Sequence, residues 1–361
     1  MEKRKEIAAN KATEKRIVIL GGGESGVGAA MLAQQKGFEV FVSDSGEIKE
    51  KYKKVLQDIA IEWEEGKHTM DKILNATEVI KSPGIPDTVP LIHQIKENGI
   101  GVISEIEFAG RYTTAKMIGI TGSNGKTTTA MLTYHLLKKA GLDVGLAGNI
   151  GDSLAKQVAQ GDRKYYVLEL SSFQLDGMFD FKVDIAMILN ITPDHLDRYN
   201  NQFEQYVASK FRILQNQTKD NEIIYCYDDE VVRIELEKEK YKAKKHPFSI
   251  ETVVANGGHI NKENLIINTN HKSFEMNIRE LALQGKHNLY NSMASGIAGR
   301  ILDLKKEVIR ESLTDFKNVE HRLEEVGKVH GITFINDSKA TNVNATWYAL
   351  ENYEYPIVWL V

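Results

Sequence analysis

The chain has 361 residues, of which 42% are hydrophobic and 27% charged, and its formal net charge is −4. One hydrophobic core seldom supports this length, so we expect two or three domains of ordinary soluble composition. The mild charge argues against a nucleic-acid partner, and no apolar run is long enough to span a bilayer. A single cysteine, Cys226, excludes a disulfide framework and a cysteine-only zinc site. The charged N-terminus has no apolar stretch behind it, so the expected location is the cytoplasm.

Short apolar runs alternate with helical patterns along the chain, which predicts an α/β fold with parallel sheets. The order strand, glycine turn, helix occurs three times, beginning near residues 16, 116 and 331. Gly37 and Gly141 stand where the first two of these helices are expected to end. From this pattern we expect domains at residues 1–112, 113–300 and 301–361.

The first glycine loop has Gly21, Gly23 and Gly26 between a predicted strand and a predicted helix. Asp44 ends the next strand, where an acidic residue can meet a ribose hydroxyl. Glycines let the backbone approach a diphosphate, and the helix N-terminus favours its negative charge. The pattern therefore predicts a nucleotide diphosphate site but does not specify nicotinamide. A dehydrogenase, or a tight turn without ligand, stays open on these residues alone.

A second phosphate loop follows the strand KMIGIT and precedes a helix. Its backbone amides can surround phosphates, its lysine can reach the β- and γ-phosphates, and the next threonine can bind Mg²⁺. The long form of this motif would have glycine at Ile120, so the loop is a shortened variant. Two phosphate loops in separate domains argue against a simple dehydrogenase. The loop residues are Gly122, Ser123, Asn124, Gly125, Lys126, Thr127 and Thr128.

Polar side chains end two further predicted strands of the middle domain. Glu169 ends one, and His195 follows the other with Asn190, Asp194 and Asp197 nearby. Such side chains lie where parallel sheets bind ligands, and a carboxylate there suits Mg²⁺. His195 taken alone is better explained as a structural histidine. On its own pattern Lys210 is one more solvated helix lysine.

The final residues, YPIVWLV, form an apolar run that predicts a buried parallel strand. A natural chain seldom stops inside such a strand, because the helix that covers it would be missing. We therefore expect these 361 residues to be the truncated part of a longer chain, with an edge strand at the chain end as the alternative.

Ten motifs occur in a fixed order: GGGESGVG, KSPGIP, TGSNGKTTT, GNIG, ELSSFQL, NITPDHLDRY, ASK, GKHNLYN, HRLE and NDSKATN. In this order they resemble the Mur ligase family, from the first glycine loop to the chain end. The resemblance implies three domains: a UDP-binding Rossmann-like one, a central ATPase with the phosphate loop, and a partial Rossmann-like C-terminal one for the amino acid. ELSSFQL and the first domain favour the D-glutamate-adding member.

The resemblance also assigns residues to the sugar nucleotide. Asp44 and Ser45 would lie near the uridine, and Asn149 and Gln174 near the sugar–alanine part. The family often has a basic residue after these two positions, whereas Gly46 stands here, which leaves the fine detail of uracil binding open. The other implied contacts are Gly23, Ser25, Gly26, Ser82 and Gly84.

For ATP, the resemblance adds Asn288 and Asn291 on the adenine side and Arg322 and Asp337 at phosphate and ribose. Lys339 and Thr341 would handle the amino-acid side. Two Mg²⁺ ions are implied, held by Thr127, Glu169, His195 and Lys210. Lys210 matches a lysine that CO₂ converts to a carbamate, an anionic oxygen ligand that suits Mg²⁺. Lys126, Glu169, His195 and Lys210 would be the catalytic residues.

The implied reaction adds D-glutamate to UDP-N-acetylmuramoyl-L-alanine with ATP, through an acyl phosphate, in peptidoglycan precursor synthesis. The expected partners are these small molecules alone, without nucleic acid or membrane, and the expected state is a monomer. Three alternatives stay open: another Mur-type amino-acid ligase, an NAD-dependent oxidoreductase, and a non-catalytic nucleotide-binding module.

Overall fold

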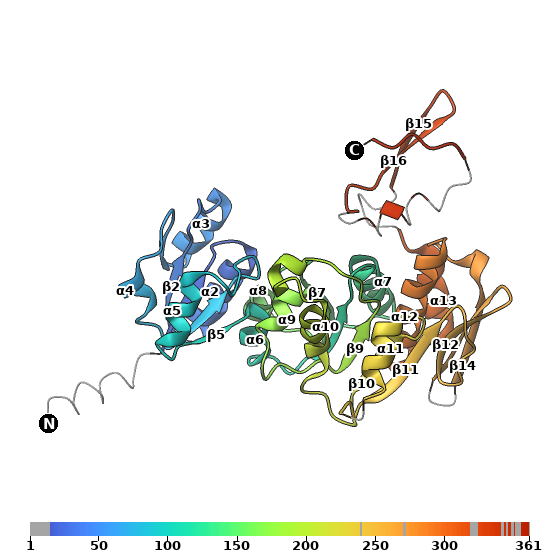
Figure 1. Cartoon of the computed structure of the whole chain (residues 1–361), viewed down its shortest axis with the longest axis horizontal. Coiled ribbons are helices and arrows are strands. Elements are labelled where there is room, and N and C mark those ends of the chain that lie inside the picture. The colour runs from blue at the N-terminus through green and yellow to red at the C-terminus, as the bar shows by residue number, and fades with distance from the viewer. Residues whose placement is uncertain are drawn as a thin grey trace, which may run out of the picture.

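The computed structural model describes residues 15–238, 240–269, 272–317, 324–340, 343, 346–347, 350 and 355–360. Figure 1 shows two α/β bodies joined along the chain, followed by a small hairpin near the C-terminus. Within the described ranges no helix is long and apolar enough to cross a membrane. Mixed α/β architecture with parallel sheets confirms the predicted fold class.

The first body has one parallel sheet of five strands, in the order β3-β2-β1-β4-β5. The strands are β1 (Arg16–Leu20), β2 (Glu39–Ser43), β3 (Glu62–Glu64), β4 (Glu78–Lys81) and β5 (Gly101–Ile103). The helices are α2 (Glu24–Gln35), α3 (Glu50–Asp58), α4 (Met70–Ile73), α5 (Pro90–Glu97) and α6 (Glu105–Gly110). All five residues of β1 are buried, because this strand lies in the middle of the sheet with helices on both faces.

The second body has a nine-stranded sheet, in the order β14-β13-β12-β11-β10-β9-β6-β8-β7. The strands are β6 (Lys116–Thr121), β7 (Val144–Gly148), β8 (Tyr165–Glu169), β9 (Ile185–Ile188), β10 (Glu222–Cys226), β11 (Lys244–Ser249), β12 (Gly257–Asn261), β13 (Asn264–Thr269) and β14 (Lys272–Asn277). The strands from β7 to β12 pair in parallel, while β12, β13 and β14 form antiparallel hairpins at the edge. β6 therefore has β8 on one side and β9 on the other.

Helices cover this sheet and connect its strands. They are α7 (Lys126–Lys139), α8 (Leu154–Gln160), α9 (Ser172–Asp176), α10 (Phe203–Phe211), α11 (Glu230–Leu236), α12 (Lys286–Ile301) and α13 (Lys306–Asp315). Short 3₁₀ turns are η1 (Leu196–Tyr199), η2 (Arg212–Leu214) and η3 (Ile278–Glu280). α13 packs against α7 and α12, so by its contacts it belongs to the second body.

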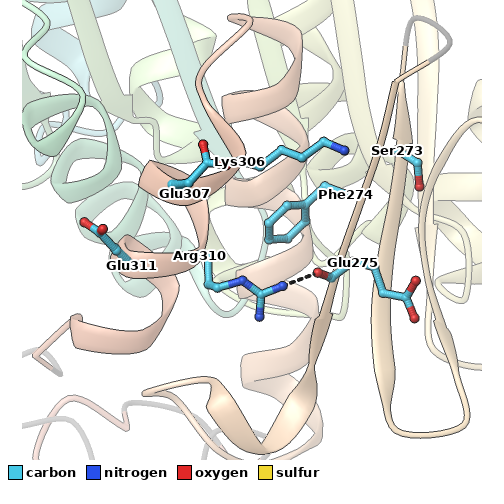
Figure 2. Close-up of a pocket in the computed structure, with 7 residues that line it drawn as sticks. All are labelled: Ser273, Phe274, Glu275, Lys306, Glu307, Arg310 and Glu311. Atoms are coloured by element: carbon cyan, nitrogen blue, oxygen red, sulfur yellow. Dashed lines mark hydrogen bonds between the residues drawn. The ribbon is translucent and has the colours of Figure 1, made fainter.

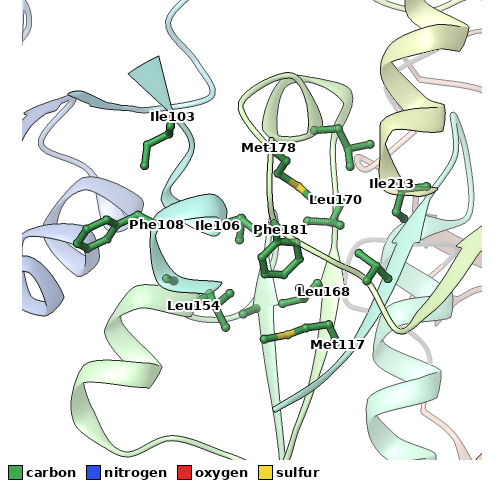
Figure 3. Close-up of a cluster of buried hydrophobic side chains, with 14 of the residues drawn as sticks. Ile103, Ile106, Phe108, Met117, Leu154, Leu168, Leu170, Met178, Phe181 and Ile213 are labelled. Carbon is green, nitrogen blue, oxygen red and sulfur yellow. The ribbon is translucent and has the colours of Figure 1, made fainter. Parts of the chain in front are cut away.

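One continuous group of buried apolar side chains, which we call the junction core, contains residues of both bodies. Figure 3 shows Ile106 of α6 near Leu154 of α8 within it, while Phe108 of α6 points the other way, toward the first body. α2 also packs on α8, and a Cβ added to Gly28 would lie 2.0 Å from Ser153 Oγ. The close helix approach requires glycine there, and it joins the two bodies into one packed unit.

Two buried glutamates attach α6 to the second body. Glu105 accepts hydrogen bonds from Ser153 Oγ (2.8 Å) and from the Ala155 N–H (2.5 Å) at the start of α8. Glu107 accepts from backbone N–H groups of the Phe179–Phe181 loop, at 2.9 Å from both phenylalanines. The helix that leaves the first sheet is therefore anchored on the second body.

The C-terminal region differs from its prediction in two respects. β16 (Ile332–Asn336) pairs antiparallel with β15 (Glu324–Val329), unlike the parallel strands of the first two strand–turn–helix units. Residues 356–360, predicted as a buried strand, are irregular, and Val358 and Leu360 are 87% and 84% exposed. A buried strand needs a paired neighbour and a covering layer, and neither is present for this segment among the described residues.

Candidate active site

The second phosphate loop joins the carboxyl end of β6 to the start of α7. Gly125 caps α7 with a left-handed backbone (φ 84°), a conformation that favours glycine. A Cβ at this position would lie 2.6 Å from Asn291 Oδ1, on α12. The loop therefore combines a positive helix end with closely packed backbone, which is the arrangement that holds phosphate oxygens.

Asn190, which follows β9, fixes the shape of this loop. Its side chain accepts from the Asn124 N–H (2.8 Å) and donates to the Asn124 carbonyl (3.0 Å). Ser123, only 5% exposed, donates from Oγ to the Thr192 carbonyl (2.8 Å) and accepts from the Thr192 N–H (2.9 Å). Ser123 therefore supports the loop through its side chain. The sequence placed Asn190 at a strand end. Its role in holding the loop follows only from the position of β9 beside β6.

Glu169, at the end of β8, lies beside the loop strand and is 1% exposed. Its Oε1 accepts from Asn149 Nδ2 (2.9 Å), while its buried Oε2 has no hydrogen-bond partner. A buried carboxylate oxygen without a donor is costly unless a cation completes it. Within the described residues no group of three His, Cys, Asp or Glu side chains is close enough to hold a metal. Glu169 still fits Mg²⁺, because this ion commonly takes one or two carboxylates together with phosphates and waters.

Lys210 lies in α10 and is 2% exposed, so the expectation of a solvated lysine from its pattern alone was wrong. Its Nζ donates to the Gly122 carbonyl (2.8 Å), which also accepts from Lys126 Nζ (2.9 Å). Burial, followed by repulsion from Lys126, holds the pKa of Lys210 well below its usual value. The structure thus brings together two predicted lysines and Gly122 from separate motifs.

His195 follows β9 and has a left-handed backbone (φ 51°), which is uncommon for a residue other than glycine. Its side chain is 56% exposed, and its Nε2 lies 3.8 Å from Asp194 Oδ2. The ring centroid is 5.3 Å from that of Phe173. An exposed imidazole at a strand end remains accessible to a ligand, which argues against the structural-histidine alternative.

The first glycine loop is tied to the ends of β2 and β4. Asp44 accepts from the Gly22 N–H (2.7 Å) and the Gly46 N–H (2.8 Å), so its carboxylate shapes the loop. A Cβ on Gly26 would lie 1.8 Å from the Gly21 carbonyl oxygen, which explains the glycine. Ser82 contacts the same loop, since a Cβ on Gly21 would lie 2.5 Å from Ser82 Oγ. The structure therefore joins the predicted Asp44, Ser82 and glycines at one edge of the sheet.

The remaining predicted contacts of the first loop are accessible to different degrees. Gly23 and Ser25 are partly buried at the start of α2, and Ser45 and Gly84 are exposed. Gln174 is 3% exposed and forms a capping box with Ser171, accepting from its N–H and its Oγ at 3.0 Å. Its side-chain oxygen is thus already used in starting α9.

Asn288 and Asn291, predicted for the adenine side, lie one turn apart on α12. Asn291 Oδ1 accepts from Thr129 Oγ1 (3.0 Å), and its Nδ2 donates to Asn288 Oδ1 (3.2 Å). Thr127 is half-buried and Thr128 buried on the first turn of α7. α12 therefore places Asn291 against the helix that begins at the phosphate loop, with Asn288 hydrogen-bonded to it.

Asp337 and Lys339 follow β16, half-buried and exposed respectively, and Figure 1 shows this hairpin outside the second body. Arg322 and Thr341 lie outside the described residues.

A separate hollow of about 570 Å³ lies between α13 and β14. Figure 2 shows Arg310 beside Phe274 there, donating to the Glu275 carbonyl (2.6 Å). None of the predicted site residues lines it. The lining residues are Ser273, Phe274, Glu275, Lys306, Glu307, Arg310 and Glu311.

Two family models match the chain. The Mur ligase MurD-like N-terminal domain matches residues 15–104, and the Mur ligase middle domain matches residues 120–299. The UDP-N-acetylmuramoylalanine–D-glutamate ligase of Christiangramia forsetii is 55% identical over 96% of this chain and 78% of that protein. The ligase of the same name from Bacteroides thetaiotaomicron is 58% identical over 94% of this chain and 76% of that protein.

Solved structures agree at the level of the fold. A UDP-N-acetylmuramate:L-alanyl-gamma-D-glutamyl-meso-diaminopimelate ligase from Neisseria meningitides has a TM-score of 0.61 at 20% identity, covering 85% of this chain and 100% of that one. The UDP-N-acetylmuramate–alanine ligase of Thermotoga maritima has a TM-score of 0.57 at 19% identity, covering 93% and 76%. The two family models and the identity to curated relatives show that this chain belongs to the Mur ligase family, with its D-glutamate-adding members as the similar relatives.

Proposed function

We propose that this protein adds D-glutamate to UDP-N-acetylmuramoyl-L-alanine, using ATP and an acyl-phosphate intermediate, in peptidoglycan precursor synthesis. The observation that carries the proposal is the meeting of three groups: a phosphate loop after β6, the unpartnered Glu169 oxygen at the end of the neighbouring β8, and buried Lys210 of α10, which donates to the loop. Relatives at 55–58% identity that bear this ligase name support the choice of amino acid.

The phosphate loop would hold the triphosphate through its backbone amides, with Asn288 and Asn291 on the adenine side. Lys126 now donates to the Gly122 and Ser123 carbonyls (both 2.9 Å) and would exchange these for phosphate oxygens. Mur ligases depend on ATP and Mg²⁺, and the ion supplies positive charge that offsets repulsion between the substrate carboxylate and the γ-phosphate. Thr127, Glu169, His195 and a modified Lys210 would hold two such ions.

Lys210 would take up CO₂ as a carbamate. The uncharged amine attacks the carbon of CO₂, a C–N bond forms, and one proton leaves the nitrogen. Burial supports this step, because a pKa well below the usual lysine value leaves more of the amine uncharged near neutral pH. The product also replaces the repulsion between Lys210 and Lys126 with attraction, since the carbamate is negative.

The first body would bind the uridine diphosphate between Gly23, Gly26, Asp44 and the loop with Ser82. From there the alanyl carboxylate reaches the phosphate loop and attacks the γ-phosphorus, and ADP leaves. The D-glutamate amine then attacks the acyl phosphate carbon, and phosphate leaves from the tetrahedral intermediate with loss of a proton. Asn149, whose side chain donates to Glu169, and Gln174 are proposed for contact with the sugar–alanine part. Lys339, with Arg322, Asp337 and Thr341, is proposed for the C-terminal side.

The domain bounds remain a proposal. They are residues 1–112, 113–300 and 301–361, and the packing of α13 against α7 and α12 supports moving the end of the central domain from residue 300 to after Asp315. The proposed location is the cytoplasm, where ATP and UDP-sugars are made, and the proposed state is a monomer.

The test is ATP-dependent phosphate release from UDP-N-acetylmuramoyl-L-alanine with D-glutamate, L-lysine or meso-diaminopimelate offered separately. We expect release that requires D-glutamate and disappears in Lys126→Ala. Release with another amino acid would overturn the substrate assignment, and unchanged turnover in Lys126→Ala would remove the second loop from the mechanism. The matched control is Lys138→Ala, an exposed lysine in the last turn of the same helix.

A further inference from the structure

Arg198 connects the two bodies on the side where their loops meet. It lies in η1, three residues after His195, and its backbone N–H donates to the His195 carbonyl (3.0 Å). Its guanidinium Nη2 donates to the Pro83 carbonyl (3.4 Å) in the loop that follows β4. One side chain therefore spans from the His195 loop of the second body to the Ser82 loop of the first.

The Phe173 ring contacts the Arg198 side chain. The guanidinium carbon lies 4.3 Å from the centre of the Phe173 ring, within the range of a cation–π contact. Tyr199 stacks on the same ring with centroids 6.2 Å apart and planes 11° apart, and His195 is tilted against it at 5.3 Å. The Arg198 guanidinium is thus held against the Phe173 ring. The elements that form this contact are α9, which also carries Gln174, and the turn η1, which His195 precedes.

Charged side chains of both signs surround Arg198. Lys81, 8% exposed, donates to the Ile85 carbonyl (2.6 Å), and its pKa is lowered by burial and further by Arg198. Asp87 is 3.5 Å from the lysine nitrogen, and Asp176 is engaged by the Tyr199 hydroxyl (2.8 Å). Two cations from different bodies therefore flank the Ser82 loop, beside the first glycine loop.

We infer that Arg198 is a positioning residue for the sugar nucleotide, holding the Ser82 loop and the His195 loop at the separation that the bound substrate spans. This inference rests on the proposed function. The proposed substrate has its diphosphate at the first body and its reacting carboxylate at the second. It therefore needs the Ser82 loop and the His195 loop at a fixed separation. Arg198 holds that separation through its hydrogen bond to Pro83 and its contact with the Phe173 ring. Its positive charge favours an anionic substrate.

Arginine suits this role better than lysine. A guanidinium is planar, so it can stack on Phe173 and donate in its own plane to Pro83 at the same time. A lysine keeps the charge but has neither the flat face nor the fork of donors. We therefore expect Arg198→Lys to recover part of the loss caused by Arg198→Ala.

The experiment measures binding of UDP-N-acetylmuramoyl-L-alanine by calorimetry without ATP, binding of ATP separately, and the KM of each in turnover. We expect Arg198→Ala to weaken sugar-nucleotide binding and raise its KM about tenfold, with ATP binding changed less than about twofold. Phe173→Leu should have a similar effect, and the double variant should be no worse than the stronger single one. The control is Arg233→Ala on α11, which removes a cation–π contact with Tyr227.

Equal losses for both ligands, or a fall in the unfolding temperature without this selectivity, would overturn the inference in favour of a structural role. Unchanged sugar-nucleotide binding in Arg198→Ala would also overturn it. If wild-type protein binds the sugar nucleotide but never ligates D-glutamate, the proposed function fails while the binding comparison still decides the role of Arg198.

Discussion

At the scale of single residues, two lysines share one carbonyl. Lys126 and Lys210 both donate to the Gly122 carbonyl, although these residues lie on different helices and are 84 positions apart in the sequence. Two ammonium groups this close repel each other, and burial adds to the cost of the Lys210 charge. The proposed carbamate would remove that charge, relieve both costs and supply an oxygen ligand near the orphaned Glu169 oxygen.

We therefore predict that Lys210→Ala lowers turnover by about 10- to 100-fold, the scale on which supports of a metal site act. Formate or acetate should restore part of the activity, since a small carboxylate can occupy the space of the lost carbamate. Phosphate release measured with and without added formate tests this. Exposed Lys219→Ala should be neutral, and a Lys210→Ala protein with full activity would refute the proposed metal role.

At the scale of elements, the buried carboxyl group of Glu105 holds α6 to α8. Glu105 is buried at the N-terminus of α8 and accepts from Ser153 and Ala155. Burial, with a smaller contribution from Glu24, raises its pKa to about 7 in spite of these hydrogen bonds. Since its ordinary value is 4.5, the protonated form is favoured by the folded state.

A raised carboxyl pKa gives stability that is complete below the unfolded value and lost as the pH rises through the folded value. Between about pH 5 and pH 8, Glu105 should therefore lower the free energy of unfolding by up to about 3 kcal/mol. We predict that Glu105→Gln flattens this part of the stability curve, because the amide keeps the acceptor oxygen without titrating. Urea unfolding at several pH values measures it, with exposed Glu97→Gln as the control. An unaltered slope in Glu105→Gln would contradict the assignment.

At the scale of the whole molecule, the junction core makes one packed unit of two sheets that are separate in topology. Leu154 is 0% exposed within it and lies beside side chains of α6 (Figure 3). Substrates held by the first body can thus be placed against the phosphate loop without a loose hinge between these two bodies.

We predict one cooperative thermal transition for the two sheets together, observed by calorimetry and circular dichroism. Leu154→Ala should lower the free energy of unfolding by about 2–5 kcal/mol and shift that transition without splitting it. Leu132→Ala, equally buried but in the second body's other core, serves as the comparison. Two separate transitions in the wild-type protein would show that the bodies fold independently.

The sequence by itself was sufficient for the local units. Glycines at positive φ, strand ends and the start of α7 follow from neighbouring residues, so the first two strand–glycine turn–helix units and the α/β class were predicted correctly. The apolar run at 356–360 was predicted wrongly, because burial of a strand depends on partners that the run itself does not contain.

Only the tertiary structure decided which distant residues meet. The pattern around Lys210 is that of an exposed helix, and its burial results from α10 packing near the loop after β6. In the same way, Arg198 reaches Pro83, and Asn190 holds Asn124, because the sheet order places β9 beside β6 and the junction core fixes the first body against the second. Periodicity encodes the face and the end of an element, whereas contacts across many residues are set by the order of strands and the packing between layers.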